Sequence, residues 1–387
     1  MDNRESHITE GHNANRAVNI AMLGGDGIGP EVVQATRPVI DGLANRSDLG
    51  ITFNLTDINY SGSDYEQHGT LFEHNLAARL QSNDLVLFGA LGTPSIAPGI
   101  LERGVILAMR TAFDQAVNVR PVRLYPGVSS PVQGVTPESC DIVFVRENLE
   151  GSYAAGGSSV HDNTEREVAI QESISTASTI RRTVHYAFSL AQNRRKKLTL
   201  CHKSNILRAA GALWQRIVDE ESQHFPDVEV DYVNADAMCL HLPLSPDRFD
   251  VVVTDNLFGD ILTDLGAMVQ GGIGLAASAN INVERTAPTM IEGVHGSAPD
   301  IAGRGWASPY ATMLSLAMGL AHYGHVQAAQ AIENAVAAEI RSQPIISGSD
   351  LPGGTQGVGE RVAERVTRAD SSQLPGSLFD GLALSPS

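Results

Sequence analysis

The chain has 387 residues, of which 27 are Lys or Arg and 44 are Asp or Glu, so its formal net charge is −17 at pH 7. Nucleic-acid phosphates and anionic membrane surfaces are met by an excess of Lys and Arg, so this balance excludes both as expected partners. Hydrophobic residues make up 42% of the chain and charged residues 18%, which is typical of a globular protein.

Targeting and redox signals are absent from the sequence. No run of about 18 apolar residues occurs, so we expect no transmembrane helix. Residues 1–16 are polar, without the apolar core of a secretory signal, and we expect a flexible extension there. The three cysteines, Cys140, Cys201 and Cys239, have no CxxC or zinc-ligand spacing, which favours reduced thiols in a cytoplasmic protein.

The first part of the chain alternates strands and helices. An apolar strand at 17–25 runs into the turn GGDGIG, and a helix at 31–45 begins behind Pro30. A strand at 51–59, a helix at 71–82 and a buried strand at 84–91 continue this order, which predicts a mainly parallel sheet covered by helices. A loop at 92–99, a helix at 103–115, an extended segment at 117–127 and a strand at 141–148 follow.

The remaining elements continue the α/β alternation. We predict strands at 168–176, 197–205, 227–234, 249–256 and within 271–281, and helical segments at 177–193, 206–224, 235–242, from 257, at 307–323 and at 327–341. Residues 149–160 are polar and glycine-rich. The end of the chain, 369–387, is rich in Ser, Pro and Gly, and we expect it to be disordered.

The GGDGIG turn invites comparison with the dinucleotide fingerprint G-x-G-x-x-G. Gly25, Gly27 and Gly29 instead give G-x-G-x-G, Pro30 follows at once, and no acidic residue closes a strand at the usual distance. We therefore interpret the segment as a tight strand–helix turn and not as a Rossmann pyrophosphate cradle.

Acidic and basic residues suggest a charged site. In DNLFGDILTDLG (255–266), Asp260 and Asp264 lie four apart on a predicted helix, so both carboxylates share one face. They could bind Mg²⁺ or Mn²⁺, or form a solvated acidic face at the helix start. Arg110, Arg120 and Arg146 could clamp a dicarboxylate through bidentate hydrogen bonds, or form three structural ion pairs.

Two further features are weaker signals. Tyr153, in the glycine-rich segment, and Lys203, after a strand, have the side chains that a proton-transfer site needs. HGSAPDIAG (295–303) is made of small residues that would let an adenine nucleotide approach the backbone, with Asp300 as a partner for ribose hydroxyls. The same loop could also be an ordinary surface turn.

Taken together and in this order, the segments resemble the β-decarboxylating dehydrogenases that act on (R)-2-hydroxy acids, the isocitrate/isopropylmalate dehydrogenase family. NLFGDILTDLG and HGSAPDIAG are the most specific motifs, and the likeness covers residues 17–368. PSIAPGILERGVILAMRTAFDQAVNVRPVRLYPGV and RRKKLTLCHKSN place the nearest likeness in the actinobacterial isopropylmalate branch.

The resemblance implies an α/β fold of two domains with mixed, mainly parallel sheets, distinct from the Rossmann fold. Residues 17–115 and 271–368 would form the cofactor-side domain, and residues 116–270 would form the domain with the substrate, the metal and the dimer interface. It also implies a homodimer in the cytoplasm, whose active sites are completed by the partner subunit, and no nucleic-acid or membrane partner.

The same resemblance implies residue roles. Arg110, Arg120, Arg146 and Asp236 would bind the substrate, a 2-hydroxy dicarboxylate, while Asp236 from across the dimer interface, Asp260 and Asp264 would bind Mg²⁺ or Mn²⁺. Lys203 would be the base for the 2-hydroxyl and Tyr153 the proton donor after decarboxylation. The cofactor site would be lined by Glu292, His295, Gly296, Ser297, Ala298, Asp300, Ile301 and Ser308. Asp300 with Ile301 implies NAD instead of NADP.

The implied reaction is the NAD-dependent oxidative decarboxylation of 3-isopropylmalate. The sequence departs from the family pattern at Gly293, where E-P-V-H-G is usual, and at Ser308, where A-N-P or A-D-P is usual. A sister activity on tartrate, D-malate or another 3-substituted malate therefore stays an alternative. A catalytically silent regulatory subunit is disfavoured, because Lys203, Tyr153, Asp260 and Asp264 are all present.

Overall fold

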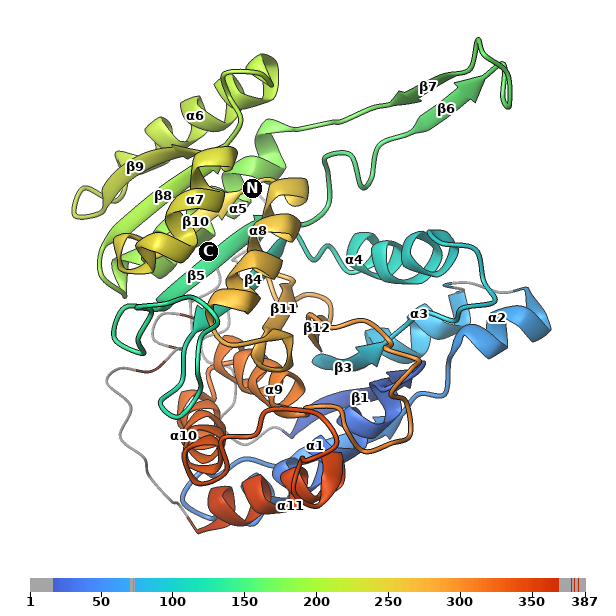
Figure 1. Cartoon of the computed structure of the whole chain (residues 1–387), viewed down its shortest axis with the longest axis vertical. Coiled ribbons are helices and arrows are strands. Elements are labelled where there is room, and N and C mark those ends of the chain that lie inside the picture. Colours follow the sequence, from blue (N-terminus) through green and yellow to red (C-terminus); the bar gives the residue numbers. More distant parts are fainter. Residues whose placement is uncertain are drawn as a thin grey trace, which may run out of the picture.

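A ten-stranded sheet runs through the whole molecule (Figure 1). The computed structural model describes residues 17–69, 72, 74–368, 377, 379 and 382, so the predicted N-terminal extension and most of the predicted disordered tail lie outside the described residues. The strand order is β2-β1-β3-β12-β11-β4-β5-β10-β8-β9. Only β11 and β4 are antiparallel to both of their neighbours, and the remaining pairs are parallel, so the sheet is mixed and mainly parallel, as predicted.

The strands of this sheet are β1 (Val18–Gly25), β2 (Phe53–Asp57), β3 (Leu85–Ala90), β4 (Val117–Arg123), β5 (Asp141–Glu147), β8 (Lys197–His202), β9 (Glu229–Asn234), β10 (Val251–Thr254), β11 (Ala277–Ile281) and β12 (Thr289–Gly293). A separate antiparallel pair, β6 (Gly157–Val160) and β7 (Val168–Gln171), projects from the body as an arm (Figure 1).

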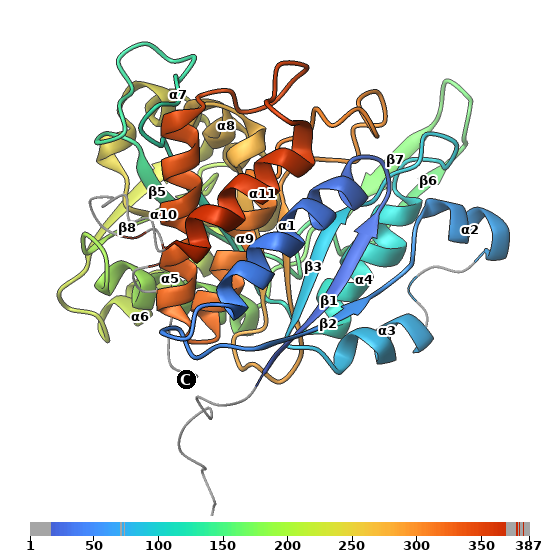
Figure 2. The same cartoon turned by 90° about the horizontal axis from the view of Figure 1, so that it is seen from below.

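Helices cover both faces of the sheet, and strand alternation decides which face each residue joins. In β5, Val143 and Val145 pack into the largest core cluster, whereas Ile142 and Phe144 pack into a second cluster on the opposite face. The largest cluster is covered by α1 (Gly29–Ala44), α5 (Ala177–Gln192), α6 (Arg208–Ser222), α9 (Tyr310–His322), α10 (Val326–Ser342) and α11 (Gly354–Thr367). Figure 2 shows α1, α10 and α11 side by side over this layer.

The opposite face is covered in two parts. Helices α7 (Ala235–Leu244) and α8 (Asn256–Val269) pack over the β4–β5–β10 region. Over β1 and β3 lie α3 (His74–Gln81), the π-helical segment η1 (Glu102–Leu107) and α4 (Ala108–Ala112), with α2 (Gly62–His68) nearby along the chain. Two short 3₁₀ helices, η2 (Pro246–Arg248) and η3 (Ile273–Leu275), complete the described elements. None of the described helices is long and apolar enough to cross a membrane.

The turn between β1 and α1 is tight, as predicted, because β1 ends at Gly25 and α1 begins at Gly29. Gly27 has φ +59°, and a Cβ there would lie 1.8 Å from the carbonyl oxygen of Ser297. The amide of Ile28 donates a hydrogen bond of 2.8 Å to that oxygen. The glycines therefore let the turn contact the 295–303 loop.

Apart from the two short 3₁₀ helices, four elements were not predicted from the sequence: α2, β6, β12 and α11. The α11 sequence contains three glycines, which weaken helix propensity, so its stability depends on packing. Glu339 of α10 is fully buried and accepts hydrogen bonds from Arg361 Nε at 2.6 Å and Arg365 Nε at 2.9 Å, both on α11. This buried ion cluster holds α11 against α10.

We predict that Glu339→Gln lowers the free energy of unfolding by about 3 kcal/mol, because it leaves two arginines without their carboxylate. The matched control is Glu364→Gln, which breaks the exposed pair with Arg368 on the same helix and should change stability by less than about 0.5 kcal/mol. Chemical denaturation followed by circular dichroism measures both values. Equal effects of the two substitutions would contradict the anchoring role of Glu339.

Candidate active site

Three arginines converge on the sheet face that α8 covers. Strands β4 and β5 pair antiparallel, with Arg120 opposite Phe144 and Asn118 opposite Arg146, so Arg120 and Arg146 share the face of Phe144. Arg110 reaches the same place from the last turn of α4. All three are buried and line one cavity of about 300 Å³. The arginine cluster inferred from the sequence is thus one spatial group.

Asp260 is the carboxylate that these arginines face. Its Oδ1 lies 2.6 Å from Arg146 Nη1 and 3.4 Å from Arg120 Nη1, and its Oδ2 accepts a 2.6 Å hydrogen bond from the Tyr153 hydroxyl. Burial alone would raise the pKa of Asp260, but the charges of Arg146 and Arg120 and the Tyr153 hydrogen bond bring it below its usual value. Asp260 is therefore ionised at neutral pH.

Asn256, the first residue of α8, is a site residue that the sequence reasoning missed. Its Oδ1 accepts hydrogen bonds from Arg146 Nε at 3.1 Å and Nη2 at 2.7 Å, and its Nδ2 donates to the carbonyl of Glu150. Together with Asp260 it satisfies the Arg146 guanidinium, which also lies over the Tyr153 ring at 5.3 Å from the centroid. The sequence feature that could have identified Asn256 as a site residue is its position in DNLFGD, one turn before Asp260.

Lys203 and Asp236 form a pair outside this cavity. Lys203 Nζ lies 2.7 Å from Asp236 Oδ1, and neither residue lines the cavity of its own chain. The Asp236 side chain is 67% exposed, and its hydrogen bond with Lys203 lowers its pKa. The structure thus places this pair on the surface of α7 and the β8 end, where a second molecule could reach it.

Asp264 follows Asp260 by one turn of α8 and is exposed. The pKa of Asp264 is raised above its usual value. Loss of hydration is the main cause and the charge of Asp260 adds to it, while the charge of Arg120 acts in the opposite direction. A divalent cation beside the two carboxylates would remove this repulsion, and their oxygens are the ligands that Mg²⁺ and Mn²⁺ prefer. Within residues 17–69, 72 and 74–368, no three His, Cys, Asp or Glu side chains lie close enough to hold a metal. The two aspartates fit a metal whose further ligands come from substrate or another subunit.

Glu292 and His295 form the cavity wall opposite α8. Glu292 Oε1 accepts a 2.8 Å hydrogen bond from Asn280 Nδ2 and lies 3.5 Å from Arg110 Nη2. Burial lowers the pKa of His295, and its Nε2 atom is buried without a hydrogen-bond partner in the described part of the chain. A Cβ at Gly293 would lie 2.5 Å from this nitrogen. Glycine at 293, in place of the proline that is usual in the family, therefore makes room for the His295 ring. The unpaired Nε2 of His295 could form a hydrogen bond with a bound cofactor.

The rest of the predicted cofactor loop continues from this wall. Gly296 and Asp300 are exposed, Ala298 has φ +39°, and Ile301 packs against the cluster of Ile28 and Val32. Ser297 binds the β1–α1 turn through its carbonyl. The Ser308 hydroxyl donates to the carbonyl of Gly274 at 2.9 Å, so it is engaged within the protein.

The cavity combines cationic and apolar walls. Three buried arginines line the cavity together with three carboxylates, those of Asp260, Glu292 and the exposed Glu102. The guanidinium groups of the arginines are donors that could bind a carboxylate. Burial, with help from the nearby charge of Arg146, lowers the pKa of Arg120 to about 10, which still leaves it charged at neutral pH. Leu91, Ile106 and Leu107 add apolar surface. The arrangement suits a dicarboxylate with an alkyl substituent.

Comparisons with known proteins agree with this geometry. Residues 19–365 match the isocitrate/isopropylmalate dehydrogenase family. The 3-isopropylmalate dehydrogenase of Thermobifida fusca is 47% identical over 352 residues, which cover 91% of this chain and 98% of that protein. The enzyme of the same name from Corynebacterium glutamicum is 47% identical, covering 90% and 99%.

Among solved structures, the isocitrate dehydrogenase of Methylococcus capsulatus superposes with a TM-score of 0.79 at 35% identity and covers 90% of this chain and 99% of that one. The fold predicted from the motifs is confirmed by this similarity and by the mixed, mainly parallel sheet. The chain is therefore a decarboxylating dehydrogenase that belongs to the isocitrate/isopropylmalate dehydrogenase family.

Proposed function

We propose that this protein catalyses the NAD-dependent oxidative decarboxylation of 3-isopropylmalate to 2-oxo-4-methylpentanoate, a step of leucine biosynthesis, as a cytoplasmic homodimer. The observation that carries the proposal is the cavity in which three buried arginines face Asp260 and Tyr153 beside an apolar wall. Two relatives of nearly the same length, each 47% identical, bear the name of this activity.

The walls favour this substrate over others of the family. Arg110, Arg120 and Arg146 would bind the two carboxylates of the malate portion and orient them. Leu91, Ile106 and Leu107 offer apolar contact to an isopropyl group. Glu102 lines the same region, and its negative charge would repel the third carboxylate of isocitrate. The π-helical turn η1 carries Glu102, Ile106 and Leu107, and such turns recur at functional sites.

Two groups would complete the chemistry. A divalent cation held by Asp260 and Asp264, with Asp236 of the partner subunit, would supply Lewis-acid stabilisation of the negative charge that develops as CO₂ leaves. NAD, held along Glu292, His295 and the 296–301 loop, would accept the hydride from C2. The exposed side chain of Asp300 is available to ribose hydroxyls, which disfavours a 2′-phosphate and supports NAD over NADP.

Lys203 and Tyr153 would handle the protons. Burial and the adjacent Asp260 charge raise the pKa of Tyr153, so its hydroxyl stays protonated at neutral pH and can donate to C3 after decarboxylation. Lys203, paired with Asp236, would accept the proton of the C2 hydroxyl. Its position outside the cavity of its own chain favours delivery from the other copy.

Exposed apolar side chains support a dimer that would bring this pair into place. Leu240 and Leu244 on α7 and Ile261 and Met268 on α8 are each more than half exposed, and the two helices pack against each other. Exposed clusters of this kind mark interaction surfaces in soluble proteins. Val160, Val168 and Ile170 add apolar surface on the β6–β7 arm (Figure 1). A two-fold axis beside these helices would place Lys203 and Asp236 at the cavity of the second copy.

The substrate assignment is tested with the purified protein and Mg²⁺ by following NADH absorbance. We expect 3-isopropylmalate with NAD⁺ to give the largest kcat/KM, because the apolar wall gains contacts only with an alkyl substituent. Isocitrate, D-malate and tartrate should react at least about 100-fold more slowly, and NADP⁺ should lose most of the activity. Preferred turnover of D-malate or tartrate would overturn the substrate, and equal rates with NADP⁺ would overturn the role of Asp300.

A shared active site is tested by complementation between two inactive variants. Lys203→Met and Tyr153→Phe should each abolish decarboxylation alone, whereas Lys196→Met, at an exposed lysine paired with Asp227, serves as control. Refolding an equal mixture of the first two should restore about a quarter of wild-type activity, since half the dimers are mixed and each holds one intact site. No recovery, with mixed dimers verified by mass spectrometry, would show that Lys203 and Tyr153 act within one chain.

Gly259 tests the positioning of Arg146. A Cβ at Gly259 would lie 2.5 Å from Arg146 Cγ, so Gly259→Ala must displace this side chain. We expect kcat/KM for 3-isopropylmalate to fall about 100-fold. Gly266→Ala on the same helix is the matched control, because its Cβ would meet Val122 at 2.6 Å, away from the arginines. If both variants lose activity equally, the effect belongs to α8 packing.

A further inference from the structure

The proposed base, Lys203, lies just beyond the end of a strand. Strand β8 ends at His202, whose register partner Asn234 is the last residue of β9, so the paired part of the sheet stops one residue before Lys203. A residue beyond the paired strands depends on other hydrogen bonds to hold its backbone in one place. The place of the Lys203 backbone decides which points its Nζ can reach.

The chain on both sides of Lys203 is anchored. The His202 side chain is 1% exposed, and its Nε2 lies 3.4 Å from Asp255 Oδ2 at the start of α8. The carbonyl of Lys203 accepts hydrogen bonds from the amides of Ile206 at 3.0 Å and Leu207 at 2.8 Å, which form a turn. Between these anchors, the position of Lys203 depends on the two peptide units that flank it.

The Tyr232 hydroxyl contacts both of these peptide units. It accepts a hydrogen bond of 3.2 Å from the amide of Ser204, and it lies 3.1 Å from the carbonyl of His202, to which it can donate. Its single hydrogen can alternatively go to Asn234 Oδ1 at 3.0 Å. One phenol on β9 thus joins the residue before Lys203 to the residue after it.

The ring of Tyr232 has a separate and ordinary role. It packs against the largest core cluster, on β9 opposite Leu200. A phenylalanine would keep this packing and lose only the hydroxyl, so the contribution of the hydroxyl can be measured apart from that of the ring.

We propose that Tyr232 is a positioning residue for the reaction, acting through Lys203. A lysine side chain has a flexible four-carbon stem, so its Nζ has a fixed place only where both the backbone and the tip are held. Tyr232 holds the backbone, and Asp236 holds Nζ at 2.7 Å. The inference rests on the proposed function and adds to it the residue that places the base.

Tyr232→Phe tests the inference in the purified full chain, with saturating Mn²⁺ and NAD⁺ and the 2-hydroxy acid that the wild type oxidises fastest. We expect kcat to fall at least about 10-fold, because a small displacement of a reacting group is costly. KM should stay within about two-fold, since the arginines that bind the carboxylates are untouched. The Tm should fall by no more than about 4 °C.

A partial reaction separates positioning from a merely structural role. The 2-oxo acid formed when that substrate is oxidised has no C2 hydroxyl, so its decarboxylation needs no proton removed by Lys203. It is prepared from its diester just before use, and its decarboxylation is followed by CO₂ release above the uncatalysed rate. Tyr232→Phe should decarboxylate it at the wild-type rate. Equal losses in the full and the partial reaction would overturn the inference.

Tyr323→Phe is the matched control, because it removes another tyrosine hydroxyl that donates to a backbone carbonyl, that of Asp84 at 3.0 Å. It should keep the wild-type kcat. A loss as large as that of Tyr232→Phe would show that kcat responds to any such hydroxyl, and would contradict a specific role of Tyr232.

Asn234→Ala removes the other acceptor of the Tyr232 hydroxyl. It should keep at least about half of the wild-type kcat, because the hydroxyl then donates to His202 alone. A loss equal to that of Tyr232→Phe would show that the hydroxyl acts through α7, and would overturn the inference, as would a wild-type kcat in Tyr232→Phe. In these outcomes the proposed function stands, whereas an active Lys203→Met would overturn both the proposed base and this inference.

Discussion

The architecture of the site depends on the burial of one positive charge. The guanidinium of Arg146 lies at the end of an apolar strand and is 1% exposed, and an isolated charge at such a position would be strongly destabilising. Asp260 and Asn256, both on α8, provide the compensating carboxylate and amide oxygens. The orientation of α8 against β5 follows from this requirement, and Gly259 leaves the space through which the Arg146 side chain passes.

The same interaction organises the reaction site. Asp260 contacts Arg146 and Arg120 through one oxygen and the Tyr153 hydroxyl through the other. One carboxylate therefore positions both the arginines proposed to bind substrate and the phenol proposed to donate a proton. Asp264 lies one turn further along and shares the negative charge of the helix face. A cation bound there would neutralise the two aspartates without disturbing the arginines, whose own charges then remain available to the substrate.

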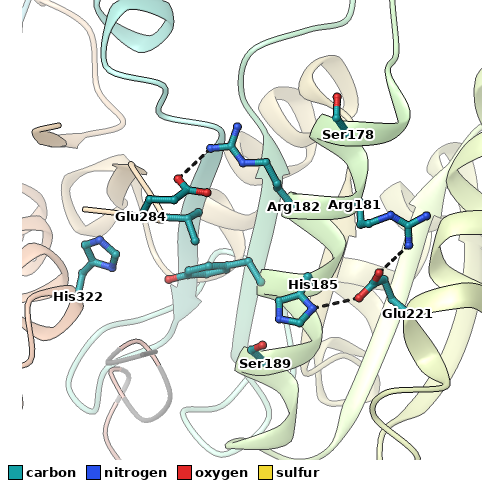
Figure 3. Close-up of a pocket in the computed structure, with 10 residues that line it drawn as sticks. Ser178, Arg181, Arg182, His185, Ser189, Glu221, Glu284 and His322 are labelled. Carbon is teal, nitrogen blue, oxygen red and sulfur yellow. Dashed lines mark hydrogen bonds and ion pairs between the residues drawn. The ribbon is translucent and has the colours of Figure 1, made fainter. Parts of the chain in front are cut away.

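An acidic chain can in this way concentrate arginines at one site. The net charge of −17 disfavours the approach of polyanions at long range, whereas three buried arginines line the cavity beside three carboxylates. Acidic residues elsewhere form pairs of their own, such as Glu220 with Arg181 and Arg216. The two faces of the sheet then have different chemistry. One carries the cavity with the three buried arginines, and the other carries a cavity beside α5 (Figure 3).

Much of this protein was determined by sequence patterns that act over short range. Strand and helix periodicity predicted the mixed, mainly parallel α/β sheet, and the failed glycine fingerprint correctly predicted a tight turn at Gly25–Gly29. The motifs around Asp260 and His295 predicted the family, which the comparisons confirmed. Helix α11 was missed because its glycines hide the helical signal and its stability comes from Glu339, 22 residues or more away.

Only the tertiary structure decided which side chains meet. The bond between Arg146 and Asn256 joins positions 110 residues apart, and that between Asn280 and Glu292 depends on strand register. Likewise, Tyr186 and His322 line one cavity only because α5 and α9 pack on the same sheet face. A local pattern shows which face of an element is apolar, since that is set by helix and strand geometry. It does not show which element packs against that face across the core, because many faces have a similar apolar character and only the complete fold determines which of them meet.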